Sequence, residues 1–390
     1  MATVLCTNGL LSKTLAVVRS MGKHGIRTIV GEKTRYHASG FSKYADKTVV
    51  YPDPALYPEQ FYKWLCETIN REKVDFLFPM DDDVMVVVIS KQEELKKLCR
   101  ILVPSLESYR VAADKSLTMR LAEERNVPYP CTAETSFGPK FNPDELLAVT
   151  AAMDYPLCIK PRVGSGSRGV RFANDAAELV SLFQEIHRSY PNPLIQEAIS
   201  YGGKYGVCLC YDSNHTVRAA FVQKEVRNFP EERGPSVVQE SIYDEKMLNY
   251  TKRLMDGIPW LGVVEVDYMI DSRTGEPKLM EINPRYWASL NLALASGVDF
   301  PWMHYQLGMD AEADSMLTYK AGVFGRQLLP GDVLHFLTSK NRWRLDPPFF
   351  TAKLKDDIIS RDDPWPTVGF LVSALRYCLD LKMWKFIITR

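Results

Sequence analysis

The sequence predicts an α/β protein of more than one domain, with a parallel sheet in its first third. Short apolar segments rich in β-branched residues alternate there with segments whose apolar residues recur at helical spacing. This alternation is typical of a parallel sheet covered by helices on both faces. The chain has 390 residues, which is enough for about two to three domains. An apolar fraction of 46% with 25% charged residues is ordinary for a globular protein.

Composition and charge narrow the class of protein. The 48 Lys and Arg residues balance the 48 Asp and Glu residues, which excludes a generally basic protein that coats nucleic acid. We therefore expect no nucleic-acid partner. The N-terminus lacks the basic and apolar segments of a secretory signal, and no uninterrupted apolar stretch is long enough to span a membrane. The eight Cys residues include no CxxC pair, so we expect a cytoplasmic protein.

The first third carries two loops of interest. Taken in order, we expect strands at residues 3–7, 26–30, 75–78 and 101–103 and helices at residues 11–21, 61–69 and 84–98. Ligands usually bind at the carboxyl ends of such strands, where Asn8 and Asp81 lie, so both residues are candidates for a substrate crevice. Alternatively, residues 81–83 only cap the helix that follows. The first turn lacks G-x-G-x-x-G, which argues against a nicotinamide dehydrogenase.

A lysine strand and a glycine-rich loop lie in the middle third. Residues 155–160 form a predicted apolar strand that ends at Lys160. The next loop can turn tightly and aim backbone N–H groups at an anion. Its residues are Gly164, Ser165, Gly166, Ser167, Arg168 and Gly169. A plain hairpin turn explains such a loop equally well, and the usual P-loop pattern is absent.

Oxygen ligands recur further along the chain. Residues 262–270 and 278–285 form a predicted β-hairpin, in which Asp267, Glu281 and Asn283 converge on one face. Mg²⁺ takes such hard oxygen ligands when it also coordinates substrate phosphates. Glu265 lies on the same face of its strand as Asp267 and is an alternative ligand. The other interpretation is an acidic hairpin that faces solvent, but the Pro-Arg-Tyr-Trp segment at 284–287 is unusual for one.

Together these motifs resemble the ATP-grasp superfamily over about residues 1–310. The lysine strand, the glycine-rich loop, a hinge at 194–199 and the segment 281–285 follow one another in the family's order. Segments 227–234 and 281–287 are similar to the predicted carboxylate–amine ligases, the branch that contains D-aspartate ligase. The resemblance implies an N-terminal parallel-sheet domain at 1–113, two α+β lobes at 114–198 and 199–320 that clamp ATP, and a helical appendage at 321–390.

The resemblance also implies roles for single residues. Lys115 and Lys160 would contact the phosphates of ATP, and Lys160 and Arg285 would be catalytic. The loop at 164–169 would close over the β- and γ-phosphates. The hinge that reads the adenine would consist of Gln196, Glu197, Ala198 and Ile199. The ligands of two Mg²⁺ ions would be Asp267, Glu281 and Asn283.

The substrate candidates are Asn8, Asp81 and Arg227. One position departs from the family's pattern, because Lys204 stands where a glutamate after the hinge often contacts the ribose. Glu197 is the alternative residue for that contact.

The implied reaction joins a small-molecule carboxylate to an amine. ATP would convert the carboxylate to an acyl phosphate, and the amine would displace phosphate to give an amide and ADP. Such chemistry needs positioned charge and no side-chain nucleophile. Two alternatives remain: activation of bicarbonate, as in biotin carboxylase, and a nucleotide-binding protein without catalysis.

The last 70 residues lie outside this pattern. We expect helices at 331–337 and 367–381, and the second has an apolar face formed by Phe370, Leu371, Ala374, Leu375, Cys378 and Leu379. Basic residues and Trp384 follow, a combination found in helices that lie on a membrane surface. A helix packed on the protein body has the same periodicity. The pattern therefore allows two interpretations, a peripheral contact with a membrane or a hydrophobic partner, and a structural helix. A homodimer is compatible with the sequence.

Overall fold

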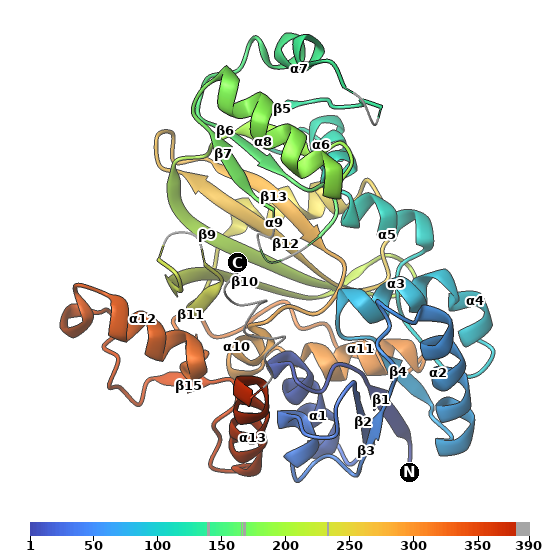
Figure 1. The fold of residues 1–390 in the computed structure, drawn as a ribbon. Helices are drawn as coiled ribbons and strands as arrows, with labels where there is room; N and C mark the ends of the chain where they lie inside the picture. Colours follow the sequence, from blue (N-terminus) through green and yellow to red (C-terminus); the bar gives the residue numbers. More distant parts are fainter. Residues whose placement is uncertain (139–140, 165, 167–168, 232–233, 380–390) are drawn as a thin grey trace.

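The N-terminal domain is a parallel sheet with the strand order β3-β2-β1-β4. The structure is a computed structural model that describes residues 1–138, 141–164, 166, 169–231 and 234–379 (Figure 1). The strands are β1 (Thr3–Cys6), β2 (Arg27–Glu32), β3 (Lys47–Val50) and β4 (Phe76–Phe78). The helices are α1 (Ser12–Lys23), η1 (Ala38–Phe41), α2 (Pro58–Glu72), α3 (Asp82–Ser90) and α4 (Gln92–Leu95). The predicted parallel sheet is therefore confirmed.

One predicted strand is wrong. Residues 101–103 form no strand, and their neighbour Arg100 makes only an isolated bridge to Phe76. The Leu102 carbonyl instead accepts a hydrogen bond from His304 Nε2 at 2.7 Å. The apolar pattern of this segment thus reflects burial against another part of the molecule and not membership of the sheet.

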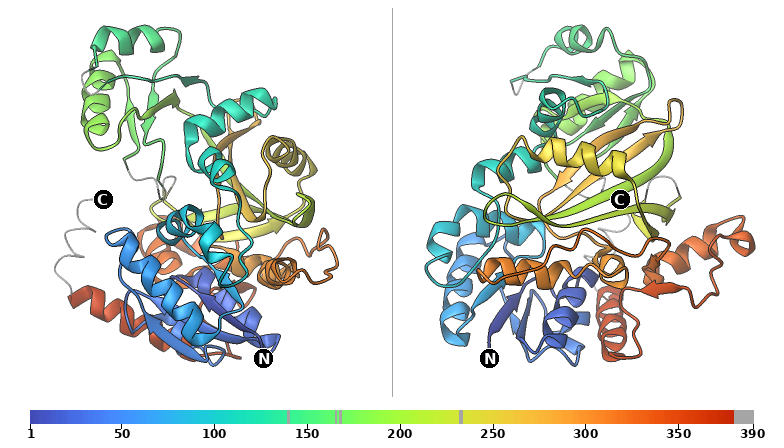
Figure 2. Two further views of the ribbon diagram at one scale, coloured as in Figure 1. Left: turned by 90° about the vertical axis from the view of Figure 1, so that its right-hand side faces the viewer. Right: turned by 180° about the vertical axis from the view of Figure 1, so that it is seen from behind.

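A small lobe stands away from the N-terminal domain (Figure 2). It follows α5 (Leu106–Ala113) and α6 (Lys115–Glu124), and its antiparallel sheet has the order β5-β8-β6-β7. The strands are β5 (Thr132–Ala133), β6 (Leu157–Lys160), β7 (Arg171–Ala173) and β8 (Leu194–Glu197). Helices α7 (Pro143–Thr150) and α8 (Ala176–Ser189) complete it, and Phe183 is fully buried in its core.

A seven-stranded sheet lies between the small lobe and the N-terminal domain (Figures 1 and 2), with the order β13-β12-β9-β10-β11-β14-β15. The strands are β9 (Tyr201–Tyr211), β10 (Val217–Asn228), β11 (Ser236–Ile242), β12 (Gly262–Asp271), β13 (Pro277–Asn283), β14 (Phe324–Arg326) and β15 (Leu354–Asp356). The neighbouring helices are α9 (Glu245–Met255), α10 (Leu290–Ala295) and α11 (Phe300–Gly308). One core joins this sheet to the N-terminal domain, since Phe221 and Trp287 cluster with Val4 and Met21.

The C-terminal region is helical in part and also contributes strands. It contains η2 (Leu328–Asp332), α12 (Val333–Thr338), η3 (Arg342–Arg344) and α13 (Trp365–Leu379). The sequence predicted only helices for this region, whereas the structure also has the strands β14 and β15, which extend the large sheet at one edge. None of the described helices is both long enough and apolar enough to cross a membrane.

The same region returns to the N-terminal domain. The Arg19 guanidinium of α1 pairs with the fully buried Asp363 carboxylate at 3.0 Å, and Ser42 Oγ donates to that carboxylate at 2.7 Å. Helix α13 packs on η1, where an added Cβ at Gly369 would lie 2.7 Å from the Phe41 ring. Residues before and within α13 are therefore fixed against the first domain (Figure 1).

Candidate active site

Lys115 connects the glycine-rich loop to the acidic hairpin. It is the first residue of α6, and its Nζ donates to the Gly164 carbonyl at 2.7 Å and pairs with Glu281 at 3.0 Å. The preceding Asp114 accepts from Ser116 N at the helix N-terminus and from Arg162 Nη2 at 2.6 Å. These contacts place a lysine charge between the loop and β13, as phosphate binding requires.

Lys160 ends β6 with its side chain almost fully buried. Burial lowers the pKa of its ammonium group below the ordinary lysine value. Within the described part of the chain, no hydrogen-bond acceptor or carboxylate pairs with its Nζ. A buried cation without a protein partner is stabilised by a bound anion.

The strand that leads into the hinge is tied to its surroundings. Gln196 Nε2 donates to Thr132 Oγ1 at 2.7 Å, and the Glu197 carboxylate accepts from Cys131 N at 2.9 Å. Glu197 also forms an ion pair with Lys278. Its carboxylate thus already has partners, and the proposed ribose contact stays a prediction.

The acidic residues of β12 and β13 face one another. Asp267 lies opposite Glu281, and Glu265 lies opposite Asn283. Asn283 Nδ2 donates to Asp267 Oδ2 at 2.9 Å and to Glu265 Oε2 at 3.4 Å. The structure therefore brings together all the residues that the sequence assigned to magnesium. Gly206 on β9 makes room for them, because a Cβ there would lie 3.0 Å from Glu265 Oε1.

The electrostatics of this cluster fit a divalent cation. Burial raises the pKa of Glu265 to about 7, and burial together with the charge of Glu265 raises the pKa of Asp267 well above its ordinary value. A cation among these carboxylates relieves their repulsion. The described residues offer no cage of three or more acidic, His or Cys ligands. Mg²⁺ beside nucleotide phosphates needs only one or two carboxylates, because phosphates and water complete its shell.

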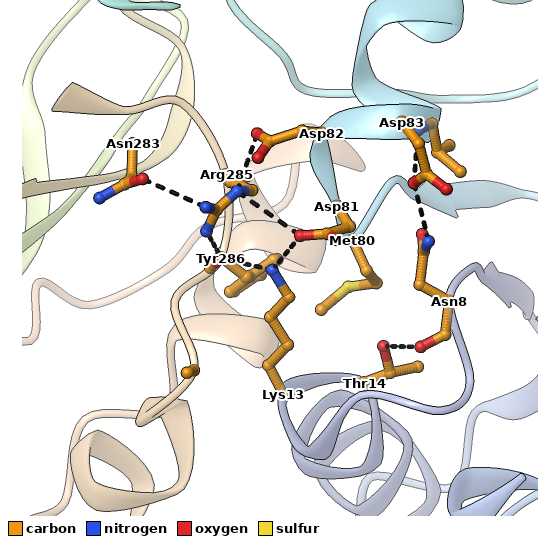
Figure 3. Close-up of polar contacts among 12 residues, drawn as sticks. Asn8, Lys13, Thr14, Met80, Asp81, Asp82, Asp83, Asn283, Arg285 and Tyr286 are labelled. Carbon is orange, nitrogen blue, oxygen red and sulfur yellow. Dashed lines mark hydrogen bonds and ion pairs between the residues drawn. The ribbon is translucent and has the colours of Figure 1, made fainter. Parts of the chain in front are cut away.

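Arg285 lies where the large sheet meets the N-terminal domain (Figure 3). Its Nε donates to Asp82 Oδ1 at 2.8 Å, and its Nη2 donates to Asn283 Oδ1 at 3.2 Å. The guanidinium thus links the acidic hairpin to the first residue of α3. An arginine so placed can neutralise charge on a reacting phosphoryl or acyl group.

Lys13 is a member of this site that sequence reasoning missed. Its Nζ donates to Asp81 Oδ1 at 2.7 Å and to the Tyr286 carbonyl at 3.0 Å (Figure 3). Burial and the charge of Arg285 lower the pKa of Lys13 to about 8. No sequence motif identifies a lysine at the second position of a helix. Its position just after the Asn8–Gly9 loop, at the carboxyl end of a parallel strand, could have indicated a place in the site.

The predicted substrate residues divide into two groups. Asn8 and Asp81 both lie at the carboxyl ends of parallel strands, and Asn8 Nδ2 donates to another acid of the Asp81 loop, Asp83, at 2.9 Å. Arg227 instead pairs with the fully buried Asp332 at 2.9 Å and donates to the Pro347 carbonyl at 2.6 Å. These contacts give Arg227 a structural role, because they join the end of β10 to η2 and to the C-terminal region. The predicted loop residues Ser165, Ser167 and Arg168 lie outside the described residues.

Comparison with known families gives a match that spans these residues. Residues 112–289 match the model of the ATP-grasp domain. The chain carries an ATP-grasp domain. The match begins just before Lys115 and ends just after Arg285, so it encloses the lysines, the acidic hairpin and the arginine. It confirms the ATP-grasp superfamily and fold but does not specify the D-aspartate ligase branch.

Individual proteins resemble parts of the chain. Acetyl-CoA carboxylase 1 of Arabidopsis thaliana is 28% identical over 152 residues, which are 37% of this chain and 7% of that protein. The biotin carboxylase domain of the 2-oxoglutarate carboxylase of Hydrogenobacter thermophilus has a TM-score of 0.68 at 15% identity, covering 83% of this chain and 73% of that one. N5-carboxyaminoimidazole synthetase of Staphylococcus aureus has a TM-score of 0.63 at 12% identity, covering 82% of this chain and 80% of that one. At these identities the structural likeness shows the fold.

Proposed function

We propose that this ATP-grasp protein is an ATP-dependent ligase that joins a small-molecule carboxylate to an amine. The observation that carries the proposal is the convergence of four kinds of group at one place. Lys115 and Glu281 are paired, Asn283 contacts Asp267, and Arg285 extends from the same segment to the N-terminal domain. This arrangement can hold nucleotide phosphates on one side of Arg285 and a second substrate on the other.

The chain's residues would serve phosphoryl transfer first. Lys115 and Lys160 would hold the phosphates of ATP, while Asp267, Glu281 and Asn283 would bind Mg²⁺. Bound magnesium supplies charge neutralisation between the β- and γ-phosphates. A carboxylate oxygen of the substrate attacks the γ-phosphorus, the bond to the β-phosphate oxygen breaks, and ADP and an acyl phosphate result. Arg285 lies where it would stabilise the negative charge on the transferring group.

Amide formation follows in the same crevice. The amine nitrogen attacks the carbonyl carbon of the acyl phosphate, phosphate leaves, and the nitrogen loses a proton. The carboxyl ends of the N-terminal strands would hold the amine, since Asp82 and Asp83 offer negative charge there. The similarity of residues 281–287 to carboxylate–amine ligases supports this acceptor over others.

A second candidate is activation of bicarbonate. It is favoured by the structural likeness to the biotin carboxylase domain, whose crystal structure contains MgADP and bicarbonate. Bicarbonate would take the place of the organic carboxylate, and carboxyphosphate would replace the acyl phosphate. The residues described above would serve either substrate, so an assay must separate the two.

ADP release by the purified protein tests the proposal. Amino acids and small carboxylates are supplied singly and in pairs, with bicarbonate as a separate arm. The ligase predicts ADP release that needs one carboxylate and one amine, and hydroxylamine in place of the amine should trap a hydroxamate. ADP release with bicarbonate alone would favour the second candidate. Nucleotide binding without turnover under every condition would refute both candidate functions.

A further inference from the structure

Two cations at the site share the same two acceptors. Lys13 Nζ lies 2.7 Å from Asp81 Oδ1 and 3.0 Å from the Tyr286 carbonyl. Arg285 Nε lies 3.5 Å from the same Asp81 oxygen, and its Nη1 donates to the same carbonyl at 3.1 Å. The shorter contact belongs to Lys13. Asp81 is therefore paired mainly with the lysine (Figure 3).

We propose that Lys13 is a positioning residue for Arg285, which it keeps available for the substrate's carboxylate by neutralising Asp81. The inference rests on the proposed ligase function, in which Arg285 meets the reacting groups. Lys13 itself is 5% exposed, and its ammonium group is engaged by Asp81 and the Tyr286 carbonyl, so it acts through these neighbours.

The charges explain why Arg285 needs this protection. Two carboxylates, those of Asp81 and Asp82, lie within ion-pair distance of its Nε. A guanidinium prefers two parallel hydrogen bonds to one carboxylate. Without Lys13, Asp81 would lose its nearest cation and turn fully to Arg285, and the donors for a substrate anion would then be occupied. The Asp82 side chain is 39% exposed, so solvent screens its ion pair with Arg285 and a substrate can displace it more readily.

Helix stability does not explain this lysine. Lys13 lies in the first turn of α1, where the helix dipole disfavours a positive charge. Its burial adds a desolvation cost, which requires close anionic or carbonyl partners. Asp81 and the Tyr286 carbonyl meet that requirement from two other elements, one in each domain. The lysine is therefore placed for a contact between domains.

A double-mutant cycle tests the inference. The variants are Lys13→Met, Asp81→Asn and the double variant, with Lys23→Met as a control at the exposed end of the same helix. We expect Lys13→Met to raise KM for the carboxylate and lower kcat, so that kcat/KM falls about tenfold or more, while KM for ATP stays within about twofold. When Asp81→Asn is already present, Lys13→Met should lower kcat/KM by less than about threefold. Lys13→Arg should restore most activity.

Two kinetic results would overturn the inference: wild-type kinetics in Lys13→Met, or an equal loss whether or not Asp81→Asn is present. If Lys13→Met does not fold, Lys13→Gln replaces it in the same cycle. A second measurement needs no turnover, namely the rate at which phenylglyoxal modifies Arg285, followed by peptide mass spectrometry. Lys13→Met should slow this modification and the double variant should restore it. A wild-type protein without ligase activity would refute the proposed function, whereas an unchanged modification rate would refute the inference alone.

Discussion

Asn283 contacts both halves of the site, the acidic residues of β12 and the guanidinium of Arg285. Its amide nitrogen donates to Asp267 and Glu265, and its amide oxygen accepts from Arg285. A carboxylate at this position could not donate, so the amide's two ends match an acidic side and a basic side. Each end of the amide thus faces one kind of group, the carboxylates of β12 and the guanidinium beside the N-terminal domain.

Removal of the charge of Glu281 should abolish catalysis. Glu281→Gln takes away the anion that pairs with Lys115, and Asn283→Ala takes away the contact to Asp267. We expect Mg²⁺-dependent ADP formation to fall by roughly 100-fold or more in either variant, with the fold retained. The measurement is ADP release at saturating Mg²⁺ with an active substrate pair.

The matched control is Glu276→Gln, which changes an exposed glutamate on the turn before β13 that pairs with Lys246. It should leave turnover near the wild-type rate. Full activity in Glu281→Gln or Asn283→Ala would mean that the metal site has been placed wrongly.

His304 should make the protein less stable in mild acid. It is buried between the Leu102 carbonyl and the Tyr286 hydroxyl, and burial lowers its pKa to about 4. In the unfolded chain its pKa is near 6.5, so the unfolded state binds a proton first as the pH falls. Stability is full above pH 6.5 and is lost as the pH falls towards 4, at about 1.4 kcal/mol per pH unit. Burial also lowers the pKa of His37 to about 4, so His37 adds to the same loss.

Urea unfolding at pH 7.0, 6.0 and 5.0 measures this dependence. The free energy of unfolding should decrease with pH in the wild type, and the decrease should be smaller in His304→Gln. The same slope in both proteins would show that His304 does not stay neutral in the folded state.

At the scale of elements, local patterns predicted six of the strands, namely β1, β2, β4, β6, β12 and β13. The alternation in the first third identified the parallel sheet because most of its strands are short buried runs. The lysine strand and the acidic hairpin also followed from alternation alone, and they carry the site. Strands β14 and β15 escaped prediction because they have only three residues each and join the sheet by pairing with segments distant in the sequence. Lys13 escaped because only the fold brings it to Asp81.

The packing of η2 against the end of β10 depends on the ion pair between Arg227 and Asp332. Both side chains are almost fully buried, at 3% and 0% exposure. Removing Arg227 leaves the buried Asp332 carboxylate with Arg326, at 3.6 Å, as its remaining cation, so the cost lies at the lower end of the roughly 3–5 kcal/mol that breaking a buried ion pair costs. We expect Arg227→Met to lower the free energy of unfolding by about that amount and to leave KM for the substrates of the folded fraction unchanged. A stable variant with a raised KM would restore the predicted substrate role.

Helix α13 places its apolar residues differently from the expected packing. Its buried face consists of small residues, Pro366, Gly369 and Ser373, which let the helix approach η1 closely. The larger apolar residues of the same helix are exposed, namely Trp365, Val368, Leu371, Val372 and Leu375. The predicted apolar face therefore points to solvent at Leu371 and Leu375, and its contact with a membrane surface or a hydrophobic partner stays a prediction.

Co-sedimentation with anionic liposomes tests that prediction. The full chain is compared with a form ending at Asp363, which keeps the buried ion pair with Arg19. Exposed apolar residues followed by Lys382, Lys385 and Arg390 should bind the full chain at low salt, and binding should weaken as salt rises. Equal, weak sedimentation of both forms would assign the exposed face a different role.

The whole molecule is organised around the junction between the N-terminal domain and the large sheet. Both sides of the site meet there, because Lys13 and Asp82 come from the first domain and Arg285 from the end of β13. The small lobe contributes Lys160 from the other side of the sheet (Figures 1 and 2). The superfamily fold could be predicted from spaced motifs, whereas the junction could not, since its contacts join residues more than 200 positions apart, as in the bond from Arg285 to Asp82.

The contact between Arg19 and Asp363 has a consequence for the order in which the chain is made. A ribosome releases the N-terminal domain first, and domains generally begin to fold as they emerge. Arg19 is nevertheless buried by residues 357, 358 and 363, which are 338 to 344 positions downstream. The N-terminal domain therefore keeps an unpaired arginine while both lobes of the ATP-grasp fold are being made. Its contacts are completed only after the lobes that follow it have left the ribosome.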